Sequence, residues 1–202
     1  MTRIKLCGLT RLCDIEAANR LRVEYVGFVF VPASRRYVSG REAAALKAAL
    51  DPSIRAVGVF VDENPDRVAE LLGAGVIDLA QLHGREDELW LARLRRRTEK
   101  PVIRAFRVKS PADMAEARAS RADYVLLDSG AGCGRTFDWS LCAGIGRPWF
   151  LAGGLDADNV ARAVAQLHPW AVDVSSGIEA GGYKDPEKME AFVRAVRKEG
   201  EP

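Results

Sequence analysis

Short runs rich in β-branched residues recur along this 202-residue chain, and a segment with helical periodicity follows each run. The runs start roughly 20 to 30 residues apart, which is the spacing of βα units in a parallel sheet. This alternation favours an α/β fold, either a closed barrel or a doubly wound open sheet. The eight predicted strands are residues 3–7, 25–30, 55–61, 77–82, 102–108, 123–128, 149–152 and 171–175.

Capping residues and apolar periodicity mark the predicted helices. In three places a residue suited to an N-cap precedes a proline suited to the first helical position. These pairs are Asn64 before Pro65, Ser110 before Pro111 and Asp185 before Pro186. Apolar residues also recur at i, i+3, i+4 and i+7 within residues 160–167 and 189–196, which predicts two amphipathic helices.

The number of βα units decides between the two architectures. No linker or change of composition divides the chain, so we expect one domain over residues 1–202. A doubly wound sheet would carry fewer strands and a Gly-x-Gly-x-x-Gly turn after the first strand, whereas Gly8-Leu9-Thr10 follows it here. Eight units predict a single compact (β/α)8 TIM barrel with its active site at the carboxyl ends of the strands.

Composition excludes several classes of function. The 30 basic and 28 acidic side chains give a net charge of +2, which is no footprint for nucleic acid. The arginine-rich residues 93–97 end a predicted outer helix, where they suit the helix dipole and the solvated surface. No apolar run approaches the roughly 20 residues of a membrane span, and no signal peptide is visible, so we expect a cytoplasmic protein. The two histidines and four cysteines show no metal-site spacing, so neither a metal nor another cofactor is expected.

Two reactive side chains end predicted strands on opposite sides of the barrel mouth. Cys7 ends the first strand and Asp128 ends the sixth. A thiolate can act as a general base if nearby positive charge, or the helix beginning near Thr10, lowers its pKa. An aspartic acid kept neutral by its surroundings can donate a proton. The alternatives are a buried structural thiol and a capping carboxylate, but an acid and a base across one pocket suit isomerisation of a sugar phosphate.

Two glycine-rich turns follow the seventh and eighth predicted strands. Gly153 and Gly154 lie in the first turn, and Ser176 and Gly177 lie in the second. Backbone N–H groups exposed by such turns bind phosphate, and barrels often place their phosphate site after these two strands. The sequence therefore predicts a phosphorylated small-molecule substrate.

The chain resembles the phosphoribosylanthranilate isomerase family of tryptophan biosynthesis in ordered motifs along nearly its whole length. The motifs lie at residues 5–10, 27–30, 34–37, 58–61, 81–84, 126–128, 134–139, 151–155 and 172–179. The resemblance implies a cofactor-free Amadori rearrangement of N-(5-phosphoribosyl)anthranilate to 1-(2-carboxyphenylamino)-1-deoxyribulose 5-phosphate. The sequence leaves the oligomeric state open between a monomer and a homodimer.

The resemblance gives roles to individual residues. It implies Cys7 as the general base and Asp128 as the general acid. The implied binding residues are Arg36 for the anthranilate carboxylate, Gly153, Gly154, Ser176 and Gly177 for the phosphate, Asp173 for a sugar hydroxyl, and Gln81 and His83 at the end of the fourth strand. The loop after Asp128 departs from the family's Gly-Gly-Thr-Gly pattern, because it carries Ala131 and Cys133. This departure leaves the loop's substrate contacts open.

Two other functions are weighed against this one. A histidine-pathway phosphoribosyl isomerase performs the same rearrangement on a larger substrate, but that family carries aspartate where this chain has Cys7. A non-catalytic phosphate-binding barrel would keep the glycine turns and would need neither Cys7 nor Asp128.

Overall fold

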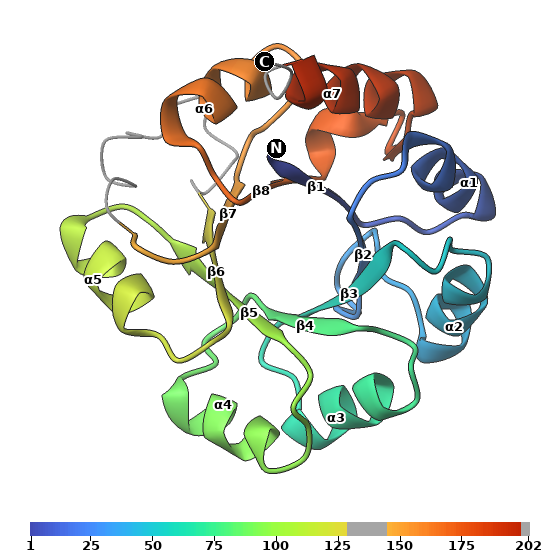
Figure 1. Ribbon diagram of the computed structural model, residues 1–202. Coiled ribbons are helices and arrows are strands. Elements are labelled where there is room, and N and C mark those ends of the chain that lie inside the picture. Colours follow the sequence, from blue (N-terminus) through green and yellow to red (C-terminus); the bar gives the residue numbers. More distant parts are fainter. Residues whose placement is uncertain (129–144, 199–202) are drawn as a thin grey trace.

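A computed structural model describes residues 1–128 and 145–198, and it confirms the predicted barrel. Each strand pairs in parallel with the next, and β8 pairs with β1 to close the ring. Figure 1 looks down the barrel and shows the helices as an outer ring. The strands are β1 (Arg3–Cys7), β2 (Tyr25–Val29), β3 (Arg55–Phe60), β4 (Leu79–Leu82), β5 (Val102–Arg107), β6 (Tyr124–Asp128), β7 (Trp149–Ala152) and β8 (Ala171–Val174).

Three helices, α3, α5 and α7, begin where the capping signals predict them. Asn64 accepts a hydrogen bond from the Asp66 backbone N–H, and Ser110 forms a capping box with Asp113. The helices are α1 (Leu12–Leu21), α2 (Gly40–Ala48), α3 (Pro65–Gly73), α4 (Glu88–Arg95), α5 (Pro111–Ala119), α6 (Val160–Leu167) and α7 (Pro186–Lys198). After β8 come a short 3-10 helix η2 (Ser176–Ile178) and a hairpin of β9 (Glu179–Ala180) and β10 (Tyr183–Lys184).

Several predicted strands are one or two residues too long. The run at 77–82 pairs with β3 only from Leu79 onward, where Leu79 lies opposite Val57. Ile77 instead packs its side chain against Gly58. Val61 and Ser175 fall outside β3 and β8 because the chain turns into loops there. Apolar composition predicts burial at these positions, but it does not fix where strand pairing stops.

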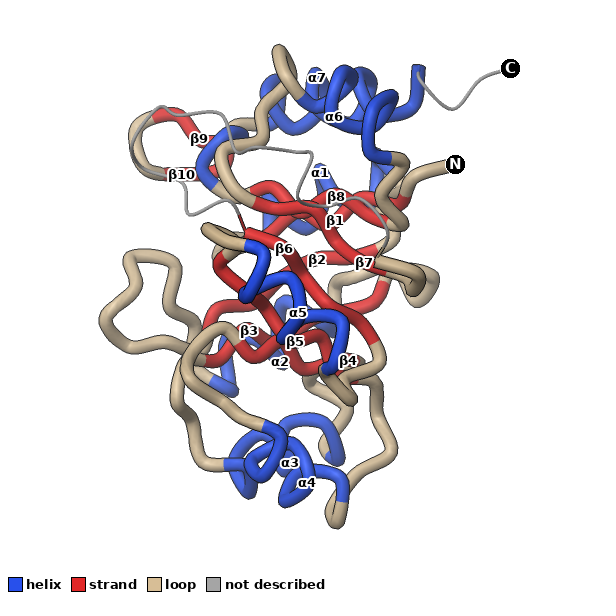
Figure 2. The backbone as a smooth tube through the Cα atoms, turned by 90° about the vertical axis from the view of Figure 1, so that its left-hand side faces the viewer, coloured by secondary structure: helices blue, strands red, loops and turns tan. Residues whose placement is uncertain are grey.

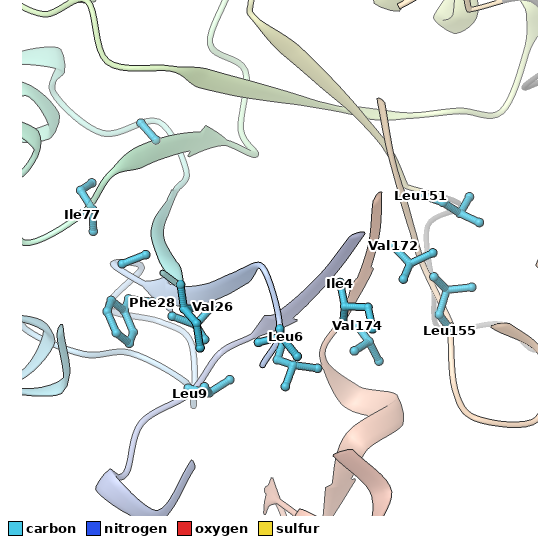
Figure 3. Packing of buried hydrophobic residues seen from close by; sticks show 14 of the residues in the cluster. Ile4, Leu6, Leu9, Val26, Phe28, Ile77, Leu151, Leu155, Val172 and Val174 are labelled. Carbon is cyan, nitrogen blue, oxygen red and sulfur yellow. The ribbon is translucent and has the colours of Figure 1, made fainter. Parts of the chain in front are cut away.

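Alternate residues of each strand face two different cores. Ile4 and Leu6 of β1 belong with Val172 and Val174 of β8 to the layer that packs against the helices (Figure 3). The intervening residues of β1, Lys5 and Cys7, have the opposite parity and point into the barrel. This period of two carries a lysine and a thiol from one strand into the barrel interior.

An aromatic cluster closes the barrel at the amino ends of the strands. The Phe150 ring lies 5.3 Å from Trp170, 5.7 Å from Tyr25 and 5.9 Å from Tyr124, centroid to centroid. The Arg3 guanidinium lies 4.2 Å from the centre of the Trp170 ring. The site residues described below lie toward the opposite end of the interior, at the carboxyl ends of the strands. In Figure 2 that end lies on the left, with β9 and β10, and the N-terminus lies on the right.

None of the described helices is both long enough and apolar enough to cross a membrane.

Candidate active site

Cys7 lies at the carboxyl end of β1 and faces the barrel interior. Its side chain contacts the cluster that Val29 and Val59 form, and the residue is buried. Gly27 provides the space for the sulfur, since a Cβ at Gly27 would lie 2.6 Å from Cys7 Sγ. The glycine of β2 therefore fixes how deeply the thiol sits.

Charged side chains surround this thiol. Lys5 precedes Cys7 by two residues on the same face of β1 and is fully buried. Its Nζ donates to both carboxylate oxygens of Asp173 at 2.9 Å. Burial raises the pKa of the Cys7 thiol, and the Lys5 ammonium opposes that effect more strongly than the Asp173 carboxylate reinforces it. The pKa of Lys5 itself is raised, because attraction to Asp173 and Cys7 outweighs the cost of burying an ammonium. Cys7 therefore does not have the lowered pKa that the sequence argument requires of a resting thiolate.

The helix that follows Cys7 begins slightly later than expected, and it carries an acidic residue in its first turn. Helix α1 begins at Leu12, and the buried Asp14 carboxylate accepts hydrogen bonds from the backbone N–H groups of Thr10 and Arg11. An acidic side chain thus lies in the first turn of the helix and binds the two backbone N–H groups that precede it. The cations near Cys7 are side chains, namely Lys5, Lys184 and Arg36.

Arg36 is held in a fixed orientation beside Cys7. Its stem crosses Gly8, where a Cβ would lie 2.5 Å from Arg36 Cδ. Gly8 has φ of +79°, so glycine serves here both for conformation and for space. The guanidinium donates from Nε to Glu179 Oε1 at 2.6 Å and from Nη2 to Glu179 Oε2 at 2.8 Å. This bidentate pair leaves Nη1 of Arg36 outside the contact with Glu179.

Glu179 also binds a second cation. Lys184 is buried, and its Nζ donates to Glu179 Oε1 at 2.6 Å and to the Ser175 backbone oxygen at 2.9 Å. Burial of Glu179 opposes ionisation, but the hydrogen bonds from Arg36 and Lys184 prevail and lower the pKa of Glu179 to about 2. The pKa of Lys184 is lowered by burial, which Glu179 only partly offsets.

Asp128 lies at the carboxyl end of β6 and contacts His83, the residue that follows β4. His83 Nε2 lies 3.2 Å from Asp128 Oδ2, and His83 Nδ1 lies 3.2 Å from Nε2 of the buried Gln81. The Gln81 amide thus faces one ring nitrogen of His83, and the other ring nitrogen faces the Asp128 carboxylate. Gln81 and His83 thus form a chain that orients Asp128, in addition to any contact with substrate.

The two glycine turns lie side by side, as the phosphate prediction requires. Gly153 and Gly154 have consecutive positive φ values of 95° and 63°. A Cβ at Gly177 would lie 2.0 Å from the backbone oxygen of Leu155, so only glycine lets the turn after β8 approach the turn after β7. Such successive turns present backbone N–H groups to an anion.

The structure brings together most of the predicted site residues. Cys7, Arg36 and Asp173 gather near β1 and β8, and Asp128, His83 and Gln81 gather near β4 and β6. Ala131 and Cys133 lie outside the described residues. The sequence analysis gave no role to three further residues of the site, Lys5, Glu179 and Lys184. One signal could have identified Lys5, because it lies between Ile4 and Leu6 on the strand face that points into the barrel.

Two features bear on metal and ligand sites elsewhere. Within residues 1–128 and 145–198, no group of three His, Cys, Asp or Glu side chains is arranged to hold a metal ion. A cavity of about 1030 Å³ lies outside the barrel mouth, between the loops that lead into α3 and α4, and it contains no predicted site residue.

Comparison with known proteins agrees with this geometry. The profile of the family described as "N-(5'phosphoribosyl)anthranilate (PRA) isomerase" matches residues 4–195. An N-(5'-phosphoribosyl)anthranilate isomerase of Endomicrobium trichonymphae is 42% identical over 98% of this chain and 99% of its own length.

Solved structures give the same result. A phosphoribosyl anthranilate isomerase in complex with reduced 1-(o-carboxyphenylamino)-1-deoxyribulose 5-phosphate has a TM-score of 0.88 and 36% identity, over 98% of this chain and 100% of that one. A structure described as monomers of the dimeric isomerase from Thermotoga maritima has a TM-score of 0.87 and 35% identity, over the same shares of the two chains. The barrel, the site at its mouth and these matches together show that the chain is an isomerase and belongs to the N-(5'-phosphoribosyl)anthranilate isomerase family.

Proposed function

We propose that this chain converts N-(5'-phosphoribosyl)anthranilate to 1-(2-carboxyphenylamino)-1-deoxyribulose 5-phosphate, with Cys7 as the general base and Asp128 as the general acid. The observation that carries the proposal is the placement of a thiol and a carboxylate at the ends of β1 and β6. The adjoining glycine turns and Arg36 provide separate sites for a phosphate and a carboxylate. Family membership favours this substrate over that of the histidine-pathway isomerase.

The reaction is an internal redistribution of protons. Asp128 protonates the furanose ring oxygen, and the ring opens to an iminium ion. The iminium acidifies the neighbouring C–H, so the Cys7 thiolate can remove the proton from the second carbon of the sugar. The resulting enolamine then tautomerises to the ketone: its first carbon takes a proton and its 2-hydroxyl group releases one. No redox step is needed, and the product has the atoms of the substrate.

The remaining residues bind and orient the substrate. Arg36 pairs with the anthranilate carboxylate through the part of its guanidinium that Glu179 does not hold. The turns at Gly153, Gly154, Ser176 and Gly177 bind the phosphate. Asp173 contacts a sugar hydroxyl with the lone pairs that its hydrogen bonds to Lys5 leave available.

The test is turnover by purified protein, measured as loss of the substrate's anthranilate fluorescence and by identification of the product. We expect turnover without added cofactor and in the presence of a chelator. Activity that disappears with the chelator and returns with a metal ion would contradict the mechanism. Retained binding of the reduced product analogue with no turnover would favour the non-catalytic phosphate-binding barrel.

Three further expectations accompany the reaction. We expect the enzyme to act in the cytoplasm. Its partner is a small phosphorylated metabolite, and no nucleic acid or membrane partner is expected. The chain is a monomer or a homodimer, which light scattering distinguishes. The whole chain forms one domain, so unfolding should show a single cooperative transition.

A further inference from the structure

The barrel interior holds a buried lysine that the proposed mechanism does not use. Lys5 has no exposed surface, although burying an ammonium costs several kcal/mol unless it is paired. It lies on the same strand face as Cys7, two residues away. In the register of β1 and β8 its direct partner is Asp173, whose side chain is 8% exposed. A side chain that served only to fill space could be apolar and would need no acidic partner. The pairing of Lys5 with Asp173 therefore indicates another role.

We propose that Lys5 is a positioning residue for the general base, and that its buried ammonium stabilises the Cys7 thiolate when the proton is taken from the substrate. The inference rests on the proposed function, because it concerns the thiol assigned there as the base. Asp173 anchors the ammonium through two 2.9 Å hydrogen bonds, so Lys5 Nζ is held in a fixed position inside the barrel, where it interacts with Cys7.

The charges around Cys7 support this role over a purely structural one. Four charged groups from different elements act on the thiol, which are Lys5 of β1, Asp173 of β8, Lys184 of β10 and Arg36 of the loop after β2. Lys5 lowers the pKa of Cys7 more than Asp173 raises it, and more than Lys184 lowers it. Lys184 is further committed to Glu179, so it is the weaker of the two lysines toward the sulfur.

The pair also explains how a buried thiol can act as a base. Removal from water disfavours a thiolate, and an isolated buried Cys7 would stay protonated at neutral pH. The Lys5 ammonium offsets part of this cost at the place where negative charge develops. Because its position is fixed in advance, the site need not reorganise during proton transfer.

The experiment titrates the Cys7 thiol directly. Thiolate formation is followed by ultraviolet absorbance as a function of pH, and Cys7 is isolated by subtracting the same titration of the matching Cys7→Ala variant. We expect Lys5→Met to raise the apparent pKa of Cys7 by about one pH unit or more. Lys184→Met is the matched control, since it removes another lysine near the same sulfur and should produce a smaller rise.

Lys5→Met leaves the Asp173 carboxylate buried without its partner, which destabilises the folded protein. The double variant Lys5→Met with Asp173→Asn leaves no unpaired charge. Since Lys5 acts on the thiol more strongly than Asp173, the double variant should still raise the pKa of Cys7. It should also raise, by the same amount, the pKa in the pH–rate profile that reports ionisation of Cys7.

The outcomes separate this inference from the assigned reaction. A folded double variant with an unchanged Cys7 titration shows that Lys5 is only structural, whether or not the protein is an active isomerase. If the variant's titration is shifted but the wild-type protein does not turn over the substrate, the role of Lys5 beside Cys7 is supported. The proposed reaction is then overturned instead.

Discussion

Replacing Glu179 by glutamine should weaken substrate binding, because Glu179 holds Arg36 in position. The carboxylate accepts hydrogen bonds of 2.6 and 2.8 Å from Arg36 and one of 2.6 Å from Lys184. The amide of Glu179→Gln keeps the size of the side chain but removes its charge and turns one acceptor into a donor. At least one Arg36 hydrogen bond is then lost, and two cations face each other without a counter-ion.

The magnitude follows from the burial of this cluster. Glu179 is 12% exposed, Lys184 is 2% exposed and Arg36 is 29% exposed. Loss of one partner of a fully buried ion pair destabilises a protein by about 3–5 kcal/mol. Because Arg36 is partly exposed, we expect a smaller loss here, about 2–3 kcal/mol. If half of that cost appears in substrate binding, KM rises about tenfold, since about 1.4 kcal/mol corresponds to a factor of ten. The turnover number should change less, because Cys7 and Asp128 stay in place.

Steady-state kinetics and urea unfolding measure the two effects separately. Glu190→Gln is the matched control, because Glu190 pairs with Arg194 on the exposed face of α7, where a pair contributes about 0.5 kcal/mol or less. The reasoning is refuted if Glu179→Gln, like Glu190→Gln, leaves both KM and the free energy of unfolding at their wild-type values.

Three further predictions concern the floor, the thiol and acid stability. Phe150→Ala should lower the free energy of unfolding by about 3–5 kcal/mol in urea titrations, since the ring is fully buried in the aromatic floor; a change below about 1 kcal/mol would contradict the packing. Gly27→Ala should reduce turnover about 100-fold, because the added Cβ displaces Cys7 Sγ. The control is Gly73→Ala, which should keep its turnover because a Cβ there meets nothing within 4 Å. Equal activity of the two variants would refute the steric argument. The pKa of Glu179 falls from 4.5 to about 2, so its contribution to stability is full above pH 4.5 and is lost as the pH falls through about 2. The stability difference between wild type and Glu179→Gln should therefore persist at pH 4 in urea titrations, and its disappearance there would contradict the lowered pKa.

The sequence predicts the barrel because its signals are local. Helix caps such as Asn64 before Pro65 act within one turn, and strand parity acts within two residues, so neither needs the tertiary structure. Strand ends such as Ile77 were less predictable, because pairing stops where a neighbouring strand stops. That limit depends on the closure of the ring.

The candidate site divides in the same way. Cys7 and Asp128 could be placed at strand ends from periodicity alone. The partners of the site could not, because Arg36 and Glu179 are 143 residues apart and Lys5 and Asp173 are 168 residues apart. The capping of α1 was missed for the same reason, since composition does not show that Asp14 folds back onto the backbone N–H groups before α1.

The central claim is that the Cys7 thiol is the base of a metal-free isomerisation, and turnover of N-(5'-phosphoribosyl)anthranilate by Cys7→Ala tests it most directly. The matched control is Cys133→Thr, which removes a different thiol. The account predicts that Cys7→Ala abolishes the loss of substrate fluorescence while still binding the reduced product analogue, and that Cys133→Thr stays within a few-fold of wild type. Turnover by Cys7→Ala within a few-fold of wild type would contradict it.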